Sequence, residues 1–166
     1  LVEPELEGTE TETETGTGTG TGAGLTAVAL RHPLIERLVM DRGEPYVPTD
    51  VELRADRTWL LYGVNSVGKS SLLKSVAVAV VMAQAGLYVA ADRFALRPFA
   101  RLFTRTGNDD DMYMHHSSFV KEMTETKEIV RHCDARSLVI ADELCASTEI
   151  ESAAAIVGAL LHVLAQ

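Results

Sequence analysis

The sequence predicts an α/β fold, and three observations support that prediction. Short segments with the apolar pattern of strands alternate with longer segments free of helix breakers, as in domains with a largely parallel sheet. A glycine-rich string stands between one such strand and a long helix. Two acidic residues directly follow a later strand. We therefore expect a sheet flanked by helices.

Residues 1–24 differ in composition from the rest of the chain. They hold six Glu and no Lys or Arg, and removing these six charges from the formal net charge of −9 leaves −3. Residues 8–22 alternate Thr with Glu and then with Gly, so no apolar burial offsets the entropy cost of ordering them. We expect residues 1–24 to be a disordered tail and residues 25–166 to form one domain. That nearly neutral domain has no electrostatic footprint for nucleic acid.

The remaining composition excludes several classes of protein. The chain starts at Leu1 instead of Met, so we expect a fragment of a longer protein. The longest apolar stretch, residues 76–89, is too short to span a bilayer, and no secretory leader is visible. Cys133 and Cys145 lack metal-ligand spacing. We expect free thiols, with a disulfide as the less favoured alternative, in an intracellular protein of unassigned compartment.

The expected elements follow from periodicity and breakers. Residues 26–30 are apolar, residues 34–40 fit a helix or a strand, and residues 41–50 hold the glycine and prolines of a loop. The helix over 69–85 is apolar nearly all round and ends at Gly86, so we expect it to be buried. Strands are expected at 51–57, 59–62, 87–90, 101–105 and 137–141, and further helices at 117–132 and 149–165.

Several other residues have ordinary structural interpretations. Trp59 and Tyr62 are expected in the core of a strand. The pair His115-His116 lies in the polar loop 106–116 and is expected to be solvated, because a metal site needs more ligands. The run 109–111 lacks the spacing and closing Glu of a calcium loop. The apolar face of the helix 117–132 is expected to consist of Phe119, Val120, Met123, Ile129 and Val130.

A phosphate-binding loop is indicated by the string from Gly63 to Ser70. It reads G-V-N-S-V-G-K-S and matches the pattern G-x-x-x-x-G-K-[ST] between an expected strand and an expected helix. Its glycines let the backbone curl so that N–H groups face phosphates, and the following helix end favours anions. Lys69 is expected to reach the β- and γ-phosphates, and the Ser70 hydroxyl to ligate Mg²⁺. The alternative is a glycine-rich turn without a ligand.

Asp142 and Glu143 directly follow the apolar run 138–141. Many strands end in a carboxylate, but in a chain with a phosphate loop the pair indicates an ATPase. Asp142 would then hold Mg²⁺, directly or through water. Glu143 would orient or deprotonate the attacking water. The alternative is a solvated turn that leads into a helix.

Seven stretches resemble the ATPase domain of the MutS family of DNA mismatch-repair proteins, in the family's order and at about its spacing. The resemblance extends from residue 31 to about residue 165. The stretches are an R-H-P stretch at 31–36, an F-[IV]-[AP]-N-like segment at 46–50, the phosphate loop at 63–71, M-A-x-x-G-x-[FY]-V-P at 82–90, an F-T-R stretch at 102–111, S-T-F-x-x-E-M-x-E at 117–125, and the acidic element at 137–148.

The resemblance implies a P-loop NTPase with an ABC-ATPase-like sheet, ATP and Mg²⁺ as cofactors, and a dimer with a second MutS-like subunit. Each composite ATP site would join the loop of one subunit to the signature serine, Ser117, of the other. Locally, Ser117 also fits a helix cap. DNA would be contacted through domains outside this chain. The implied nucleotide-binding residues are Tyr46, Gly63, Asn65, Ser66, Val67, Gly68, Lys69, Ser70 and Ser71. The implied catalytic residues are Glu143, Lys69 and Ser117, and the implied metal ligands are Ser70 and Asp142.

The sequence departs from the family pattern at several positions. Val64, Ser66 and Val67 replace the usual P, M and G of the loop, Thr49 replaces an Asn, and residues 145–147 replace G-R-G. The loop and the cysteine resemble those of divergent homologues from large DNA viruses and octocoral mitochondria. Two other functions remain open. One is another ABC-type ATPase, although residues 112–123 lack an L-S-G-G-Q-like signature. The other is a remnant that binds nucleotide without turnover.

Overall fold

The computed structural model describes residues 1–6, 23–54, 57–105, 117–145 and 149–164. Helices and strands both occur in these ranges, and the expected α/β class is confirmed at that level. The chain divides into two compact units, residues 1–98 and residues 99–166, and each unit is described by itself. None of the helices in the described ranges is long and apolar enough to cross a bilayer.

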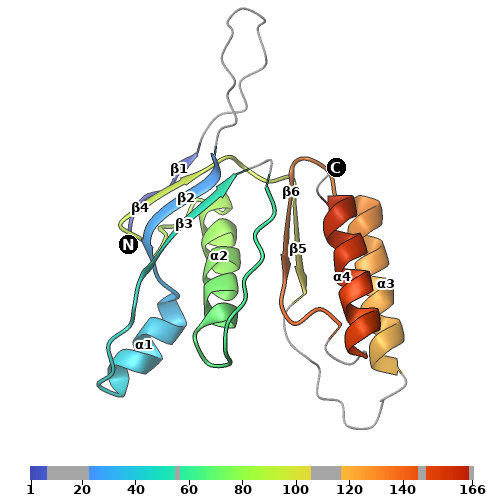
Figure 1. Cartoon of the computed structure of the whole chain (residues 1–166). Coiled ribbons are helices and arrows are strands. Elements are labelled where there is room, and N and C mark those ends of the chain that lie inside the picture. The colour runs from blue at the N-terminus through green and yellow to red at the C-terminus, as the bar shows by residue number, and fades with distance from the viewer. Residues whose placement is uncertain (7–22, 55–56, 106–116, 146–148, 165–166) are drawn as a thin grey trace, which may run out of the picture. The chain divides into compact units, whose positions relative to one another are not determined.

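The first unit contains a four-stranded sheet in the order β1-β4-β2-β3 (Figure 1). Strands β1 and β4 are parallel, whereas β2 is antiparallel to both β3 and β4. The prediction of a largely parallel sheet is therefore wrong for this unit. The apolar pattern of a strand does not depend on whether its neighbour is parallel or antiparallel, so the pattern could not reveal the direction. The strands are β1 (Glu5–Leu6), β2 (Ala23–Leu30), β3 (Thr49–Arg54) and β4 (Arg93–Leu96).

Alternate residues of β2 and β4 supply the core of this unit. Leu25 and Ala27 of β2 are buried, as are Phe94 and Leu96 of β4, while Val28 is exposed. This is the period of two that a sheet with one covered face requires. The strand expected at 51–57 begins earlier and ends at Arg54.

The two ends of the expected disordered tail are ordered. Val2 and Val89 exchange two main-chain hydrogen bonds of 2.8 Å, and Glu5 of β1 lies opposite Ala95 of β4. The prediction of disorder is thus wrong for residues 1–6, because main-chain pairing to a sheet edge needs no apolar side chains. Ala23 and Gly24 belong to β2, and residues 7–22 lie outside the described residues.

Residues 34–40, which fitted a helix or a strand, form part of helix α1 (Pro33–Asp41). The helix begins with proline in its first turn, where the missing N–H costs nothing. His32 caps it, since its Nδ1 accepts a hydrogen bond of 3.3 Å from the Ile35 main-chain N–H. The residues that follow form a loop as far as Pro48.

The long helix α2 (Lys69–Gln84) has nearly the expected bounds, and Gly86 follows its C-cap residue Ala85 with a left-handed φ of 73°. Its buried residues share one face, whereas Val81 is 56% exposed. The expectation of a helix buried all round is therefore wrong. In the first unit one side of the helix faces the core, so apolar composition alone overstates its burial. The buried residues are Ser75, Val76, Ala79, Val80 and Ala83.

Two expected strands of the first unit are absent from the described residues. Residues 59–62 are not in a strand, and Trp59 and Tyr62 are 46% and 90% exposed instead of buried. Residues 87–90 contain only an isolated bridge at Val89. The physical reason is that an apolar run becomes a strand only where a neighbouring strand takes its hydrogen bonds.

In its described residues, the second unit contains a parallel pair of strands and two helices that lie side by side (Figure 1). The predicted ranges of β5, β6 and α3 are confirmed, and α4 starts one residue later than expected. Residues 106–116, with the histidine pair and the aspartate run, lie outside the described residues. The elements are β5 (Arg101–Arg105), α3 (Ser117–His132), β6 (Ser137–Ala141) and α4 (Ile150–Leu164).

The apolar face of α3 is only partly as expected. Ile129 is buried, and Met123 and Val130 are half-buried, but Phe119 and Val120 are exposed. The buried residue near this end of the helix is Glu122, which is 3% exposed. In β6, expected to be buried throughout, Ile140 alone is buried and its neighbours are half-buried. Hydrophobicity is thus an incomplete guide to burial in this unit, because an ion pair occupies part of its interior.

Candidate nucleotide-binding site

The loop before α2 contains two left-handed backbone positions. Ser66 and Gly68 have left-handed φ angles of 67° and 96°, and Gly68 is the N-cap of α2. The Lys69 ammonium donates hydrogen bonds of 2.8 Å to the carbonyl oxygens of both Gly63 and Val64. The lysine therefore draws the start of the loop towards the first turn of the helix.

This arrangement suits an anion. The first N–H groups of a helix have no partner within the helix, and the helix dipole places partial positive charge at the same end. Lys69 adds a full charge beside them. Ser70 and Ser71 are half-buried in the first turn, whereas Asn65 is exposed. Several hydrogen-bond donors are thus gathered at one end of α2.

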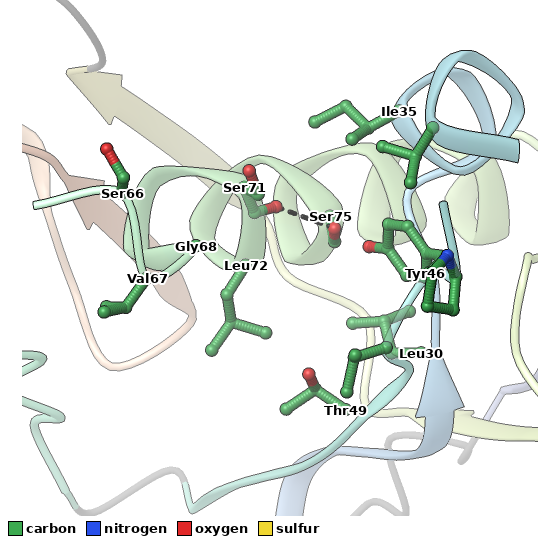
Figure 2. Close-up of a pocket in the computed structure, with 13 residues that line it drawn as sticks. Leu30, Ile35, Tyr46, Thr49, Ser66, Val67, Gly68, Ser71, Leu72 and Ser75 are labelled. Carbon is green, nitrogen blue, oxygen red and sulfur yellow. Dashed lines mark hydrogen bonds between the residues drawn. The ribbon is translucent and has the colours of Figure 1, made fainter. Parts of the chain in front are cut away.

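A pocket of about 390 Å³ adjoins the loop. It lies between α1, the loop before β3 and the first half of α2. Figure 2 shows Ser66 and Val67 towards one end and Tyr46 towards the other, with Leu72 of α2 between them. Lys69 is not among the residues that line it. The lining residues are Leu30, Ile35, Val39, Pro45, Tyr46, Val47, Thr49, Ser66, Val67, Gly68, Ser71, Leu72 and Ser75.

Tyr46 is fixed in this pocket by a contact to the start of α1. Its hydroxyl oxygen accepts a hydrogen bond of 3.0 Å from the main-chain N–H of His32. The imidazole of His32 is itself buried and caps the helix. Burial lowers the pKa of His32 below its ordinary value of 6.5, and the positive charge of Lys74 adds to this shift. The neutral ring can accept the capping hydrogen bond. His32 therefore contacts both the first turn of helix α1, through its ring, and Tyr46, through its main-chain N–H.

The expected acidic pair lies in a tight turn after β6 in the second unit. The Asp142 N–H donates a hydrogen bond of 2.8 Å to the carbonyl oxygen of Arg105, at the end of β5. Glu143 is exposed and Asp142 is half-buried. Glu143 and Cys145 have left-handed φ angles of 52° and 60°, which are uncommon outside glycine. The backbone thus turns sharply on both sides of Leu144.

Cys145, at the end of this turn, contacts Glu122 of α3. The Cys145 main-chain N–H donates to Glu122 Oε1, and the Cys145 side chain is buried. Burial raises the pKa of the Cys145 thiol, and the negative charge of Glu122 raises it further. Neither Cys145 nor Cys133 is in a disulfide, as expected.

Comparison with known proteins places this chain in a family. The model of MutS domain V matches residues 59–166. The chain belongs to the MutS family. MutS relatives include the mitochondrial DNA mismatch repair protein mutS homolog of Sarcophyton glaucum, which is 40% identical over 138 residues, a match that covers 83% of this chain and 14% of the relative. The expected resemblance to the octocoral mitochondrial branch agrees with this relative.

Two further MutS relatives show the same relation. The DNA mismatch repair protein MutS of Caulobacter vibrioides is 42% identical over 123 residues, covering 71% of this chain and 14% of that protein. The DNA mismatch repair protein msh3 of Aspergillus fumigatus is 41% identical over 133 residues, covering 79% of this chain and 12% of that protein. The chain therefore spans about one-seventh or less of the length of these relatives.

The expected site residues of this MutS chain fall into two groups. Tyr46, Ser66, Val67, Gly68 and Ser71 line one pocket in the first unit. Asp142 and Glu143 lie in the second unit, where Ser117 is the first residue of α3. The side chain of Ser117 is outside the description. In the described ranges, no three or more His, Cys, Asp or Glu side chains form a group that could hold a metal ion. The expected magnesium ligands, Ser70 and Asp142, come one from each unit.

Sequence reasoning missed the ion pair that supports the acidic turn. Arg105 contacts Glu122 at 3.1 Å, and Glu122, which accepts from the Cys145 N–H, was not expected to have a role in the site. A signal was present in the sequence. Glu122 and the buried Ile129 are seven residues apart, so they share a face of α3. An acidic residue on a face that also carries buried apolar residues indicates a partner of opposite charge.

Proposed function

We propose that this chain is the ATP-binding and ATP-hydrolysing domain of a MutS-like protein that couples ATP to the recognition of mismatched DNA. The observation that carries the proposal is the Lys69 loop at the start of α2, with a pocket that extends from the loop to Tyr46. The DNA-binding part rests on the family, because the described relatives are DNA mismatch repair proteins.

The pocket and the loop fit the two ends of a nucleotide. The volume of about 390 Å³ lies within the range of small-molecule sites, ~300–1,000 Å³. Apolar side chains and the Tyr46 ring suit a base, whereas the helix end and the Lys69 ammonium suit phosphates. On this proposal the ammonium exchanges its two carbonyl partners for phosphate oxygens, which gives charge-assisted hydrogen bonds in place of neutral acceptors.

The other candidate residues have the chemistry that hydrolysis needs. The Ser70 hydroxyl and the Asp142 carboxylate are suitable ligands for Mg²⁺, which would offset negative charge on the phosphates. The exposed Glu143 carboxylate would orient or deprotonate the attacking water. Ser117, at the start of α3, would serve the ATP bound by a second MutS-like subunit, and DNA would be bound by other parts of the protein.

The test measures ATP binding and ATP hydrolysis separately in the whole protein. Glu143→Gln keeps the shape of the side chain but removes the base, so ATP should still bind while hydrolysis falls roughly a hundredfold or more. Normal turnover by Glu143→Gln would show that the catalytic role is assigned to the wrong residue.

One alternative is favoured by a specific observation. Glu143 and Cys145 both have left-handed backbone angles, and Cys145 stands where the family has glycine. A residue with a Cβ at a left-handed position where the family has glycine alters the turn that carries Glu143, and an altered turn suits a nucleotide-binding remnant that does not hydrolyse ATP. ATP binding without turnover in the unmutated protein would decide for that alternative. No binding at all would reject both.

A further inference from the structure

The turn that carries Glu143 is fixed at both of its ends. At the first end, the Asp142 N–H donates to the carbonyl oxygen of Arg105, which continues the pairing of β6 with β5. At the second end, the Cys145 N–H donates to Glu122 Oε1. Between the two anchors lie only Glu143 and Leu144. The direction of the Glu143 side chain therefore depends on where these two main-chain groups are held.

Arg105 is common to both anchors. Its carbonyl oxygen takes the Asp142 N–H, and its guanidinium lies 3.1 Å from Glu122. Glu122 is 3% exposed, and a buried carboxylate is stable only when it is paired and hydrogen-bonded. The guanidinium supplies the charge partner and the Cys145 N–H supplies a hydrogen bond. One buried ion pair thus connects α3, β5 and the acidic turn.

The backbone of the turn needs such an anchor. The left-handed φ angles of Glu143 and Cys145 are unfavourable for side chains with a Cβ, and such angles persist only where surrounding contacts impose them. The buried Cys145 side chain and its N–H bond to Glu122 are the contacts that hold the second of these residues.

We propose that Glu122 is a positioning residue of the ATPase: through the Cys145 N–H it fixes the acidic turn and aims Glu143. Arg105 keeps the Glu122 carboxylate in place and carries the other anchor. The proposal rests on the proposed hydrolysis of ATP. It assigns to α3 a role within its own subunit, in addition to the role expected of Ser117.

The experiment compares Glu122→Gln with Glu125→Gln in the whole protein. Glu125 is a matched control, because it lies on the same helix and faces the same arginine at 3.4 Å. In the part of the chain that the structure describes, no hydrogen bond or ion pair joins Glu125 to residues 142–145. Two quantities are measured: hydrogen exchange of the main-chain amides at 142–145, and the steady-state constants kcat and KM for ATP.

Glu122→Gln should raise the exchange rate at residues 142–145 about tenfold or more, because a charge-assisted hydrogen bond is weakened. The kcat should fall about tenfold to a hundredfold, since a misdirected base loses reaction geometry, while KM changes less than about twofold. Glu125→Gln should match the unmutated protein in both readouts. Glu122→Asp keeps the charge beside Arg105 but shortens the side chain, so it should show the same two effects and replaces Glu122→Gln if that variant does not fold.

Other outcomes overturn the proposal in distinguishable ways. Unchanged exchange in a folded Glu122 variant would mean that no anchor exists. Raised exchange with unchanged kcat would mean that the anchor does not aim Glu143. An equal loss of kcat in Glu125→Gln would assign the effect to Arg105 pairing in general. If the unmutated protein hydrolyses no ATP, the proposed function fails and the positioning role with it, while the exchange measurement still reports whether the anchor exists.

Discussion

Replacing Gly68 with Ala strains the phosphate loop without adding a steric clash. Gly68 has a φ of 96°, and a Cβ added there meets no atom within 4 Å. The cost is therefore conformational, about 1–2 kcal/mol for a residue with a Cβ in the left-handed region. The lower entropy of the unfolded chain offsets part of this, roughly 0.4–1 kcal/mol. We expect Gly68→Ala to lower the free energy of unfolding by about 1 kcal/mol.

Variants of two other glycines serve as controls that distinguish a loss of stability from a loss of ATP binding. Gly86 has a left-handed φ of 73° with no atom near the added Cβ, but it lies beyond the end of α2 and does not line the pocket. Gly86→Ala should therefore cost a similar free energy of unfolding. Gly158 lies within α4, and an added Cβ there also meets no atom within 4 Å. Gly158→Ala should stabilise the protein by about 0.5–1 kcal/mol, because Ala favours a helix interior.

Urea denaturation measures the three stabilities, and titration calorimetry measures ATP affinity in the same variants. Gly68→Ala should weaken ATP binding about tenfold, because the loop must relax away from the backbone that presents its N–H groups. Gly86→Ala and Gly158→Ala should bind ATP as the unmutated protein does. If Gly68→Ala bound ATP as tightly as Gly86→Ala, the assignment of the loop backbone to phosphate binding would be refuted.

Two further predictions concern His32 and Ser117. Because the pKa of His32 is lowered in the folded state, the unfolded state binds more protons below pH 6.5, so the free energy of unfolding should fall as the pH drops from 6.5 towards the folded pKa. His32→Asn, which retains a capping side chain, should lose this part of the pH dependence, and an unchanged profile in urea melts would contradict the lowered pKa of His32. Mixing Lys69→Ala subunits with Ser117→Ala subunits should restore activity towards half of the unmutated value, because one composite site then carries neither defect. Activity no higher than the average of the two mutants would remove Ser117 from the partner's site.

Local signals predicted the ranges of α2, α3 and α4, but left residues 34–40 of α1 open between helix and strand. No helix breaker occurs between Lys69 and Gly86, and this absence predicted α2. Helix α3 begins at Ser117 and ends at His132, as expected. The ranges of β5 and β6 also follow from short apolar runs. These elements were predictable because periodicity and helix stops act within one segment.

Pairing between distant segments was not predictable in the same way. The strand expected at 59–62 is absent, while β4 (Arg93–Leu96) forms without having been expected. Whether a run becomes a strand depends on a neighbour that the local pattern does not name. The same limit applies to the ends of the tail, where Val2 pairs with Val89.

In the candidate site, too, the residues of local motifs were predictable and a contact between distant segments was not. The loop residues and Tyr46 were expected from motif and resemblance, and the first unit brings Tyr46 and Gly68 to one pocket. The contact of Glu122 with Cys145 spans 23 positions and involves a main-chain N–H. No sequence motif encodes such a contact, because any residue except proline at position 145 offers the same donor.

We propose that Lys69 contributes to ATP binding, and the equilibrium affinity for ATP of Lys69→Ala in the whole protein tests this most directly. Lys74→Ala is the matched control, since it removes an exposed lysine from the same helix outside the lining of the pocket. We predict that Lys69→Ala weakens ATP binding about tenfold or more, because a charge-assisted contact to phosphate is lost, while Lys74→Ala changes it little. Equal ATP affinity in Lys69→Ala and the unmutated protein would contradict the account.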